Sequence, residues 1–179
     1  MMDPAVGALL TAAFALLFAS AALHKLQDLR RFAEAFGAYR LLPTALTPLA
    51  YLLPFAELAV AGSLSVTRWR TLGVLSGALL LCLYASALAL NLARGRRDLS
   101  CGCGGPNDRR AIAGWMVLRN LLLAAALAVL LLPGGSRPLA AVDALTIAAG
   151  TAVLALLYMS VDALLGRVAA RSALLQGSA

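Results

Sequence analysis

The sequence predicts an all-α, polytopic membrane protein: a helical bundle of about five transmembrane helices with one interfacial amphipathic helix. Of its 179 residues, 62% are hydrophobic and 13% are charged, and the mean hydropathy is +0.88. This composition leaves too little polar surface for a water-soluble globule. A hydrocarbon core of about 30 Å takes about 20 helical residues to cross, and five apolar windows of that length fit along the chain. We place them at residues 5–24, 44–66, 71–93, 111–132 and 142–166.

The first window includes the small-residue run at 19–22, which is also a feature of cleaved signal peptides. A signal peptide begins with basic residues, whereas the charged side chain ahead of this window is Asp3. The window is also long enough to span a membrane. We therefore expect a retained helix.

The segments between the windows are short and carry helix-ending residues at Pro43, 68–70, 101–105 and 133–135. No separate soluble domain fits between them, so we expect one domain over residues 1–179. Residues 29–39 are the exception among the connections, because their apolar side chains fall on one face of a helix. We expect this segment to lie along the membrane interface, with a solvated connector as the alternative.

Basic residues predict the orientation, because positively charged loops stay on the cytoplasmic side. One set of connections and the C-terminal end carry eleven basic residues: Lys25, Arg30, Arg31, Arg40, Arg94, Arg96, Arg97, Arg109, Arg110, Arg167 and Arg171. The other set carries three, Arg68, Arg70 and Arg137. The sequence therefore predicts an amino terminus outside and the loop around Cys101 on the cytoplasmic face. The net charge of +7 is then mainly a topology signal, and we expect no nucleic-acid partner.

Cys101 and Cys103 are separated by one glycine, and they are the candidate catalytic residues. Two such thiols can form a disulfide and exchange it with another thiolate. Arg96 and Arg109 lie close in sequence, and the loop leads into the start of the fourth window, where unpaired N–H groups favour an anion. Both features favour a reactive thiolate, so the sequence is compatible with a thiol–disulfide oxidoreductase.

Two other interpretations of these cysteines remain open. Structural zinc takes four ligands, whereas only His24 is available beside the pair, so we assign no metal residue and keep a soft-metal site of two thiolates and one imidazole as an alternative. The other interpretation gives both cysteines no role beyond structure. Cys82 lies in the middle of the third window, where a cysteine usually behaves as a small buried hydrophobe.

Glu57 and Arg119 place charges inside predicted spans, where ionisable groups are usually buried in the bundle and paired. The positions of these two residues along their spans predict a Glu57–Arg119 pair, with a role in helix packing or in function. Asn91 and Asn120 are placed to hydrogen-bond across helices near the cysteines, and Trp115 to stack on Arg119 or to mark the interface. Tyr158, Ser160 and Asp162 are interpreted as ordinary bundle and interface residues.

An ordered set of short motifs gives the chain a family resemblance. The set comprises LHKL at 23–26, YRLLP at 39–43, Glu57, NLARGR at 91–96, CGCGG at 101–105, Trp115 and VLRN at 117–120. Together they resemble the methylamine utilisation protein MauE family, which is related to the DoxX-like membrane proteins. The family usually has an aromatic residue at the place of Gly104, and this chain departs there.

The resemblance implies a fold with a DoxX-like four-helix core in the bacterial inner membrane. It implies a role in maturing or exporting the disulfide-rich small (beta) subunit of methylamine dehydrogenase, with a thioredoxin-like partner. Cys101 and Cys103 would be the redox pair, with His24, Lys25, Arg119 and Asn120 as their environment. Glu57 and Asn91 complete the expected supporting set.

The direction of electron flow stays open in this interpretation. A cytoplasmic cysteine pair would draw electrons from cytosolic thiols, whereas a periplasmic pair would oxidise its partner and need a quinone to remove the electrons. No sequence feature establishes a quinone site. Two alternative functions are a small-molecule or metal-ion transporter built on Glu57 and Arg119, and a non-catalytic assembly factor whose loop holds a partner.

Overall fold

The computed structural model describes residues 2–41, 43–97, 99, 111–135 and 137–176. Over these residues the chain is helical, and the β contact described is a single bridge between Met2 and Gly134. The elements in chain order are α1 (Pro4–Gln27), α2 (Leu29–Ala38), η1 (Thr44–Leu52), α3 (Leu53–Ser65), η2 (Thr67–Trp69), α4 (Arg70–Ala93), α5 (Gly114–Ala128), η3 (Val129–Leu131) and α6 (Ala141–Gln176). The all-α prediction is confirmed.

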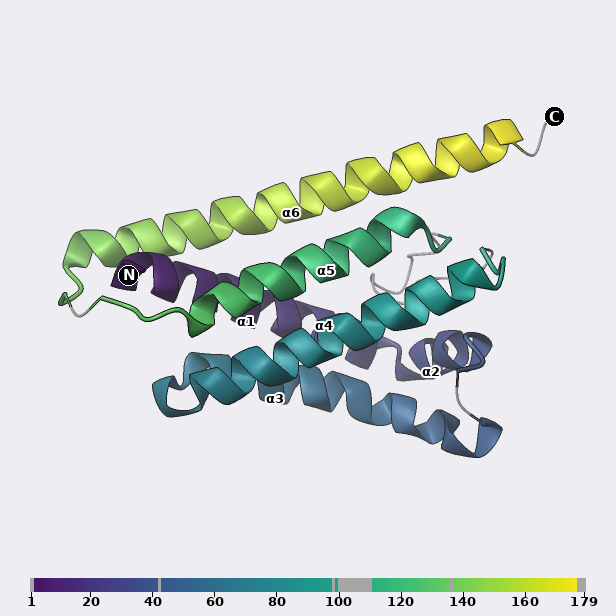
Figure 1. The fold of residues 1–179 in the computed structure, drawn as a ribbon, viewed down its shortest axis with the longest axis horizontal. Coiled ribbons are helices and arrows are strands. Elements are labelled where there is room, and N and C mark those ends of the chain that lie inside the picture. The colour runs from purple at the N-terminus through teal and green to yellow at the C-terminus, as the bar shows by residue number, and fades with distance from the viewer. Residues whose placement is uncertain (1, 42, 98, 100–110, 136, 177–179) are drawn as a thin grey trace.

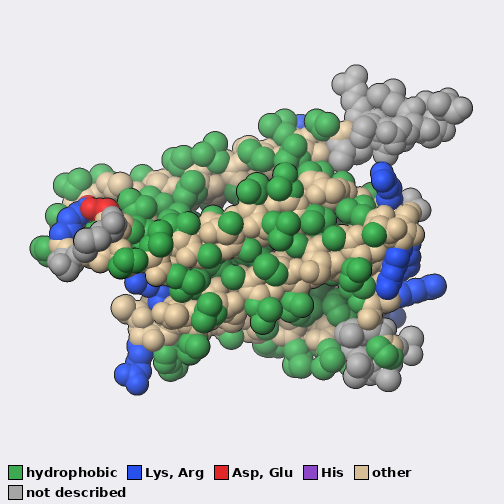
Figure 2. Space-filling model, in the orientation of Figure 1, with side chains coloured by type: hydrophobic (Ala, Val, Ile, Leu, Met, Phe, Trp, Pro, Cys, Tyr) green, Lys and Arg blue, Asp and Glu red, His purple; other side chains and the backbone are tan. Residues whose placement is uncertain are grey.

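Five helical stretches are long and apolar enough to cross a membrane. They are Pro4–Gln27, Thr47–Ser65, Thr67–Ala93, Gly114–Leu131 and Ala141–Val168, and each overlaps one predicted window. Figure 1 shows the long helices running roughly the same way across the molecule. In Figure 2 the visible face is a broad apolar band, with most Lys and Arg side chains gathered at its two ends. The prediction of five transmembrane helices is confirmed.

The junction between α1 and α2 follows from one aspartate. Asp28 ends α1, and its side chain accepts a hydrogen bond of 3.1 Å from the backbone N–H of Arg31 in the first turn of α2. Asp28 therefore acts as the N-cap of α2. In Figure 1, α2 is seen nearly end-on, so it lies crosswise to the long helices. A helix between residues 29 and 39 is thereby confirmed, in the crosswise arrangement that an interfacial helix requires.

The main core lies where α1, α3, α4 and α5 meet. Its most buried side chains include Phe18, Leu64, Val74 and Leu127, each at most 1% exposed. Glycines let the helices approach: a Cβ on Gly73 would lie 2.8 Å from the backbone nitrogen of Leu64. Small residues at helix contacts are common in membrane bundles because they allow this backbone proximity.

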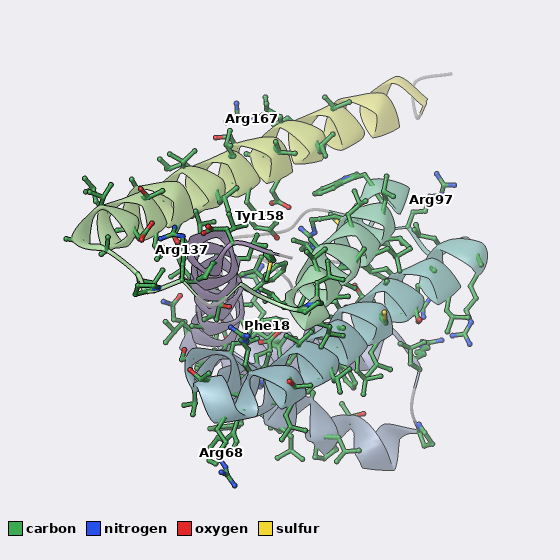
Figure 3. The ribbon with its side chains drawn as sticks, turned by 60° about the vertical axis from the view of Figure 1, so that its left-hand side comes forward. Phe18, Arg68, Arg97, Arg137, Tyr158 and Arg167 are labelled. Carbon is green, nitrogen blue, oxygen red and sulfur yellow. The ribbon has the colours of Figure 1, made fainter. Side chains whose placement is uncertain are left out.

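The last helix, α6, lies along the outside of the bundle (Figures 1 and 3). None of its most apolar window is buried. It packs on α1, where a Cβ on Gly150 would come within 2.4 Å of the Leu9 side chain. Its beginning is tied down by Arg137, whose guanidinium contacts Asp3 at 2.9 Å and Asp143 at 2.7 Å.

Candidate functional site

Three helices bring together a buried cluster of polar side chains at one end of the bundle. Lys25, in the last turn of α1, places its Nζ 2.6 and 2.9 Å from the two carboxylate oxygens of Glu57 on α3. Tyr84 on α4 donates a hydrogen bond of 2.8 Å from its hydroxyl to the same carboxylate. The side chains of Lys25 and Glu57 are 6% and 1% exposed. We call these three residues the Lys25 cluster.

The surroundings of the Lys25 cluster explain why the charges can be buried. An isolated charge in an apolar interior is very costly, whereas a hydrogen-bonded pair of opposite charges compensates much of that cost. The ammonium group also lies 5.6 Å from the ring centroid of Phe32 and 5.5 Å from that of Tyr84, and both distances fall in the range of a cation–π interaction. The cluster is therefore neutral overall and held by contacts from four helices.

A small pocket opens beside the Lys25 cluster. Its lining is mostly apolar and aromatic, and consists of Lys25, Phe32, Ala35, Phe36, Tyr39, Leu41, Leu53, Tyr84, Ala87 and Leu88. The crosswise helix α2 supplies one wall, and α4 supplies another. The pocket thus joins the interfacial side of the bundle to its buried ion pair.

The base of the cysteine loop lies next to this pocket. The backbone N–H of Ile112 donates to the carbonyl of Leu99 at 3.0 Å, so the chain leaves and re-enters the bundle at one place. Ile112 packs in a cluster with Tyr39, Leu88 and Met116. Tyr39 and Leu88 also line the pocket. Cys101 and Cys103 themselves lie outside the residues that the structure describes.

Tyr39 joins α2 to this region in a second way. Burial raises the pKa of Tyr39 to about 12, so its hydroxyl stays protonated at neutral pH. Arg96, which follows α4, donates to the carbonyls of Tyr39 at 3.2 Å and Ala38 at 2.8 Å. These bonds satisfy carbonyl groups at the end of α2, which a helix otherwise leaves unpaired.

The two predicted asparagines donate to carbonyls of their own helices. Asn91 and Asn120 are buried, at 0% and 4% exposure. Their side-chain amides donate to Ala87 at 3.0 Å and Met116 at 2.8 Å, each one turn earlier. The carbonyl oxygen of Asn91 accepts a bond of 3.2 Å from Arg96. Among the described residues, the side-chain bonds of these two asparagines thus run along the chain, where the preceding carbonyl is the nearer acceptor.

The predicted Glu57–Arg119 pair is wrong. Glu57 pairs with Lys25, and Arg119 forms an ion pair with Asp162 on α6, with both side chains 15% exposed. The error came from placing the end of the first span at residue 24, which counted Lys25 as a loop charge. Helix α1 continues to Gln27, and this extension carries Lys25 inside. The predicted stacking of Trp115 on Arg119 is confirmed, with the guanidinium carbon 5.3 Å from the ring centroid.

Two partners are not evident from the sequence patterns. Asp162 was interpreted as an ordinary residue, although an aspartate inside an apolar span is itself a sign of a buried pair. Tyr84 gives no such sign, because tyrosine is common in and around membrane spans. The hydrogen bond from Tyr84 to Glu57 can be recognised only once α3 and α4 are known to be neighbours.

The remaining candidates stand apart from the Lys25 cluster. His24 is exposed, although it directly precedes Lys25. Among the described residues no three His, Cys, Asp or Glu side chains gather as a metal site. Cys82 is exposed on the outside of α4, so the expectation that it is a buried packing residue is wrong.

Five stretches able to cross a membrane, packed around a buried ion pair, define this chain as a multi-pass membrane protein. The chain belongs to the methylamine utilisation protein MauE family, whose model matches residues 3–133, the part that contains α1 through η3. The resemblance drawn from the short motifs is thereby confirmed.

Curated relatives support the same membership. The methylamine utilization protein MauE of Methylophilus methylotrophus is 36% identical over 92% of this chain and 88% of its own. The protein of the same name from Paracoccus denitrificans is 37% identical over 89% and 87% of the two chains. The one from Paracoccus versutus is 37% identical over 96% and 92%. No solved structure matches the chain.

Proposed function

We propose that this protein supports thiol–disulfide maturation of an exported client in methylamine utilisation, with Cys101 and Cys103 as the exchanging pair. The client would be the small (beta) subunit of methylamine dehydrogenase, and a thioredoxin-like protein would carry electrons between the two. The observation that carries this proposal is the pair of cysteines, one residue apart, between α4 and α5 in the sequence of a MauE-family membrane protein. The relatives' name supports the methylamine context.

The chemistry needs only the cysteine pair and a carrier with two thiols of its own. A thiolate of the carrier attacks one sulfur of the Cys101–Cys103 disulfide, a mixed disulfide forms, and the second carrier thiolate releases the reduced pair. Run in the opposite direction, the same steps oxidise the pair and reduce the carrier. Positive charge near the cysteine pair supports a reactive thiolate, because Arg96 and Arg97 lie in the segment that leads from α4 toward Cys101.

The proposed setting is the bacterial inner membrane, with the amino terminus outside. The end of the bundle that contains Lys25, α2 and Arg96 would face the cytoplasm, because most basic residues gather there. The cysteine loop would start from that face. The bundle would then hold the exchanging loop at the membrane surface, within reach of a soluble carrier.

Serine substitutions test this function directly. Cys101→Ser and Cys103→Ser should each abolish formation of the client's disulfides in cells whose own copy of this gene is deleted. One of the two should also accumulate a mixed disulfide with a thioredoxin-fold protein, because the resolving thiol is gone. The measurement is the thiol content of the client subunit, together with non-reducing gels of the membrane fraction.

Cys82→Ser is the matched control, since Cys82 lies on the exposed side of α4. It should leave the client fully oxidised. If the double variant Cys101→Ser, Cys103→Ser also matures the client normally, the protein is an assembly factor that holds a partner without exchanging thiols.

A further inference from the structure

The pocket beside the Lys25 cluster has the composition of a ligand site. Four of its residues are aromatic: Phe32, Phe36, Tyr39 and Tyr84. Ligand pockets are typically apolar with a few placed polar groups, and here the ammonium group of Lys25 is such a group. The cavity holds about 70 Å³, which suits the edge of one small ring better than a long chain.

One of the hydrogen bonds that Lys25 donates is long. An ammonium group carries three donors. Two of them reach the oxygens of Glu57 at 2.6 and 2.9 Å, and the third has the carbonyl of Ala21 at 3.5 Å. That distance is at the outer limit of a hydrogen bond. An acceptor oxygen in the pocket would therefore gain a short bond without displacing Glu57.

The charge balance selects the kind of acceptor. The charges of Lys25 and Glu57 cancel each other. An anionic group that entered the pocket would lose its hydration, and no net positive charge would compensate that loss. A neutral carbonyl oxygen loses far less on leaving water. The aromatic walls favour a flat ring next to that carbonyl, because rings stack with offset or edge-on geometry.

The position of the pocket adds a functional reason. Tyr39 and Leu88 line it and also belong to the cluster that packs Ile112 at the base of the cysteine loop. The crosswise helix α2 forms a wall, so the pocket lies near the level expected for the membrane interface. The pocket is therefore close both to the membrane interface and to the start of the segment that carries the cysteines. This position suits a ligand that dissolves in the bilayer and accepts electrons from thiols.

We propose that this pocket binds the ring of a membrane quinone, with one ring carbonyl accepting a hydrogen bond from Lys25. The redox consequence rests on the proposed function in its oxidising direction, in which the carrier reduces the cysteine pair and the quinone reoxidises it. That direction belongs to a periplasmic pair, so it requires the orientation opposite to the one that the basic residues predict. When Cys101 and Cys103 form their disulfide they lose two electrons and two protons, and the quinone takes up both to become the hydroquinone. The Lys25 ammonium group would hold the ring by its hydrogen bond to one of the carbonyl oxygens that take up these protons.

A change of pocket size tests the site without breaking the ion pair. Ala87→Leu places a larger side chain in the pocket, and Ala89→Leu adds the same atoms on the exposed side of the same helix. The full-length protein in lipid nanodiscs is titrated with decylubiquinone, and binding is followed by quenching of the intrinsic fluorescence. We expect saturable binding that Ala87→Leu weakens by about tenfold or more, while Ala89→Leu leaves it unchanged.

Two comparisons distinguish a quinone site from a pocket that accepts any apolar ring. Decylbenzene has the chain and ring without the carbonyl groups, and it should bind at least about tenfold more weakly. Equal binding of the two compounds, or binding that Ala87→Leu does not weaken, would overturn the proposal. The variant with serine at both 101 and 103 should bind the quinone as the parent does.

The same variants distinguish a failed site from a failed function. If Ala87→Leu loses quinone binding and stops reoxidation of the cysteine pair by added decylubiquinone, the site and its redox role are both supported. If reoxidation by the quinone continues in Ala87→Leu, the pocket is not the site, although thiol exchange itself would stand. If the quinone binds as expected but the cysteines never exchange with a carrier, the binding site stands and the proposed function fails.

Discussion

At the scale of single residues, the Lys25 cluster shows how this bundle keeps charges inside. Each of its polar side chains is hydrogen-bonded to another member: Glu57 accepts from both Lys25 and Tyr84. Burying such a pair contributes little net stability compared with apolar residues of the same shape, but removing one partner leaves the other charge uncompensated. The value of the cluster therefore lies in specifying how α1, α3 and α4 fit together.

Substitution of one partner should expose this dependence. Glu57→Gln leaves Lys25 buried without a counter-charge, and we expect the free energy of unfolding to fall by about 3 to 5 kcal/mol. Denaturant unfolding in detergent micelles, followed by circular dichroism, measures the change. The control is Glu34→Gln, because Glu34 pairs with Arg30 on the exposed face of α2 and such pairs contribute at most about 1 kcal/mol. Equal losses in the two variants would argue against a structural role for the buried pair.

At the scale of elements, α3 and α4 approach more closely than ordinary side chains would permit. Gly73 faces the backbone of Leu64, while Gly62 on α3 has no atom within 4 Å of where its Cβ would be. Two glycines in neighbouring helices thus have opposite surroundings. This difference makes them a matched pair for testing helix contact.

Gly73→Ala should separate the two helices, because the new methyl group would lie 2.8 Å from a backbone nitrogen that cannot move alone. We expect a loss of about 1 to 3 kcal/mol in unfolding free energy, as for other overpacked sites. Gly62→Ala should be neutral or slightly stabilising, since alanine favours helices over glycine by about 1 kcal/mol. Thermal unfolding of both variants in the same detergent decides the matter, and similar melting temperatures would contradict the close contact.

Helix α6 depends on a different kind of contact. Its apolar window is unburied, so the pair of Asp162 with Arg119 on α5 is a specific link to the bundle. Asp162→Leu should leave Arg119 without that partner and loosen the second half of α6. Faster amide hydrogen exchange there, with unchanged exchange in α1, is the expected result.

The control for α6 is Arg137→Gln, which removes a half-exposed link at the other end of the helix. Exposed pairs contribute little, so exchange in the second half of α6 should stay as in the parent. If Asp162→Leu also leaves exchange unchanged, packing on α1 alone holds this helix.

At the scale of the whole molecule, Arg68 and Arg97 mark the two opposite ends of the bundle (Figure 3). The excess of basic residues at the Arg97 end predicts which end stays in the cytoplasm. In a background with all three native cysteines replaced by serine, Arg68→Cys should react with a membrane-impermeant maleimide added to intact spheroplasts. Arg97→Cys should react only after the membrane is opened, and the reverse pattern would mean the opposite orientation.

The sequence was sufficient for the overall architecture, because span length and apolar composition are local properties. Five windows, the crosswise segment and the stacking of Trp115 on Arg119 all follow from residues close together in the chain. The ion pairs could not be predicted in the same way. Choosing between Lys25 and Arg119 as the partner of Glu57 depends on where α1 ends and on which helices are neighbours, and both are tertiary properties. The roles of Cys101 and Cys103 remain a prediction.

The hydrogen bond between Leu99 and Ile112 gives the chain between them a common point of departure and return. A segment closed in this way can change length at a small entropic cost, which grows only slowly with the number of residues. The chain between residues 99 and 112 can therefore differ in length without a change in the helices on either side. A change in the number of residues between positions 99 and 112 should therefore leave the packing of the bundle unchanged.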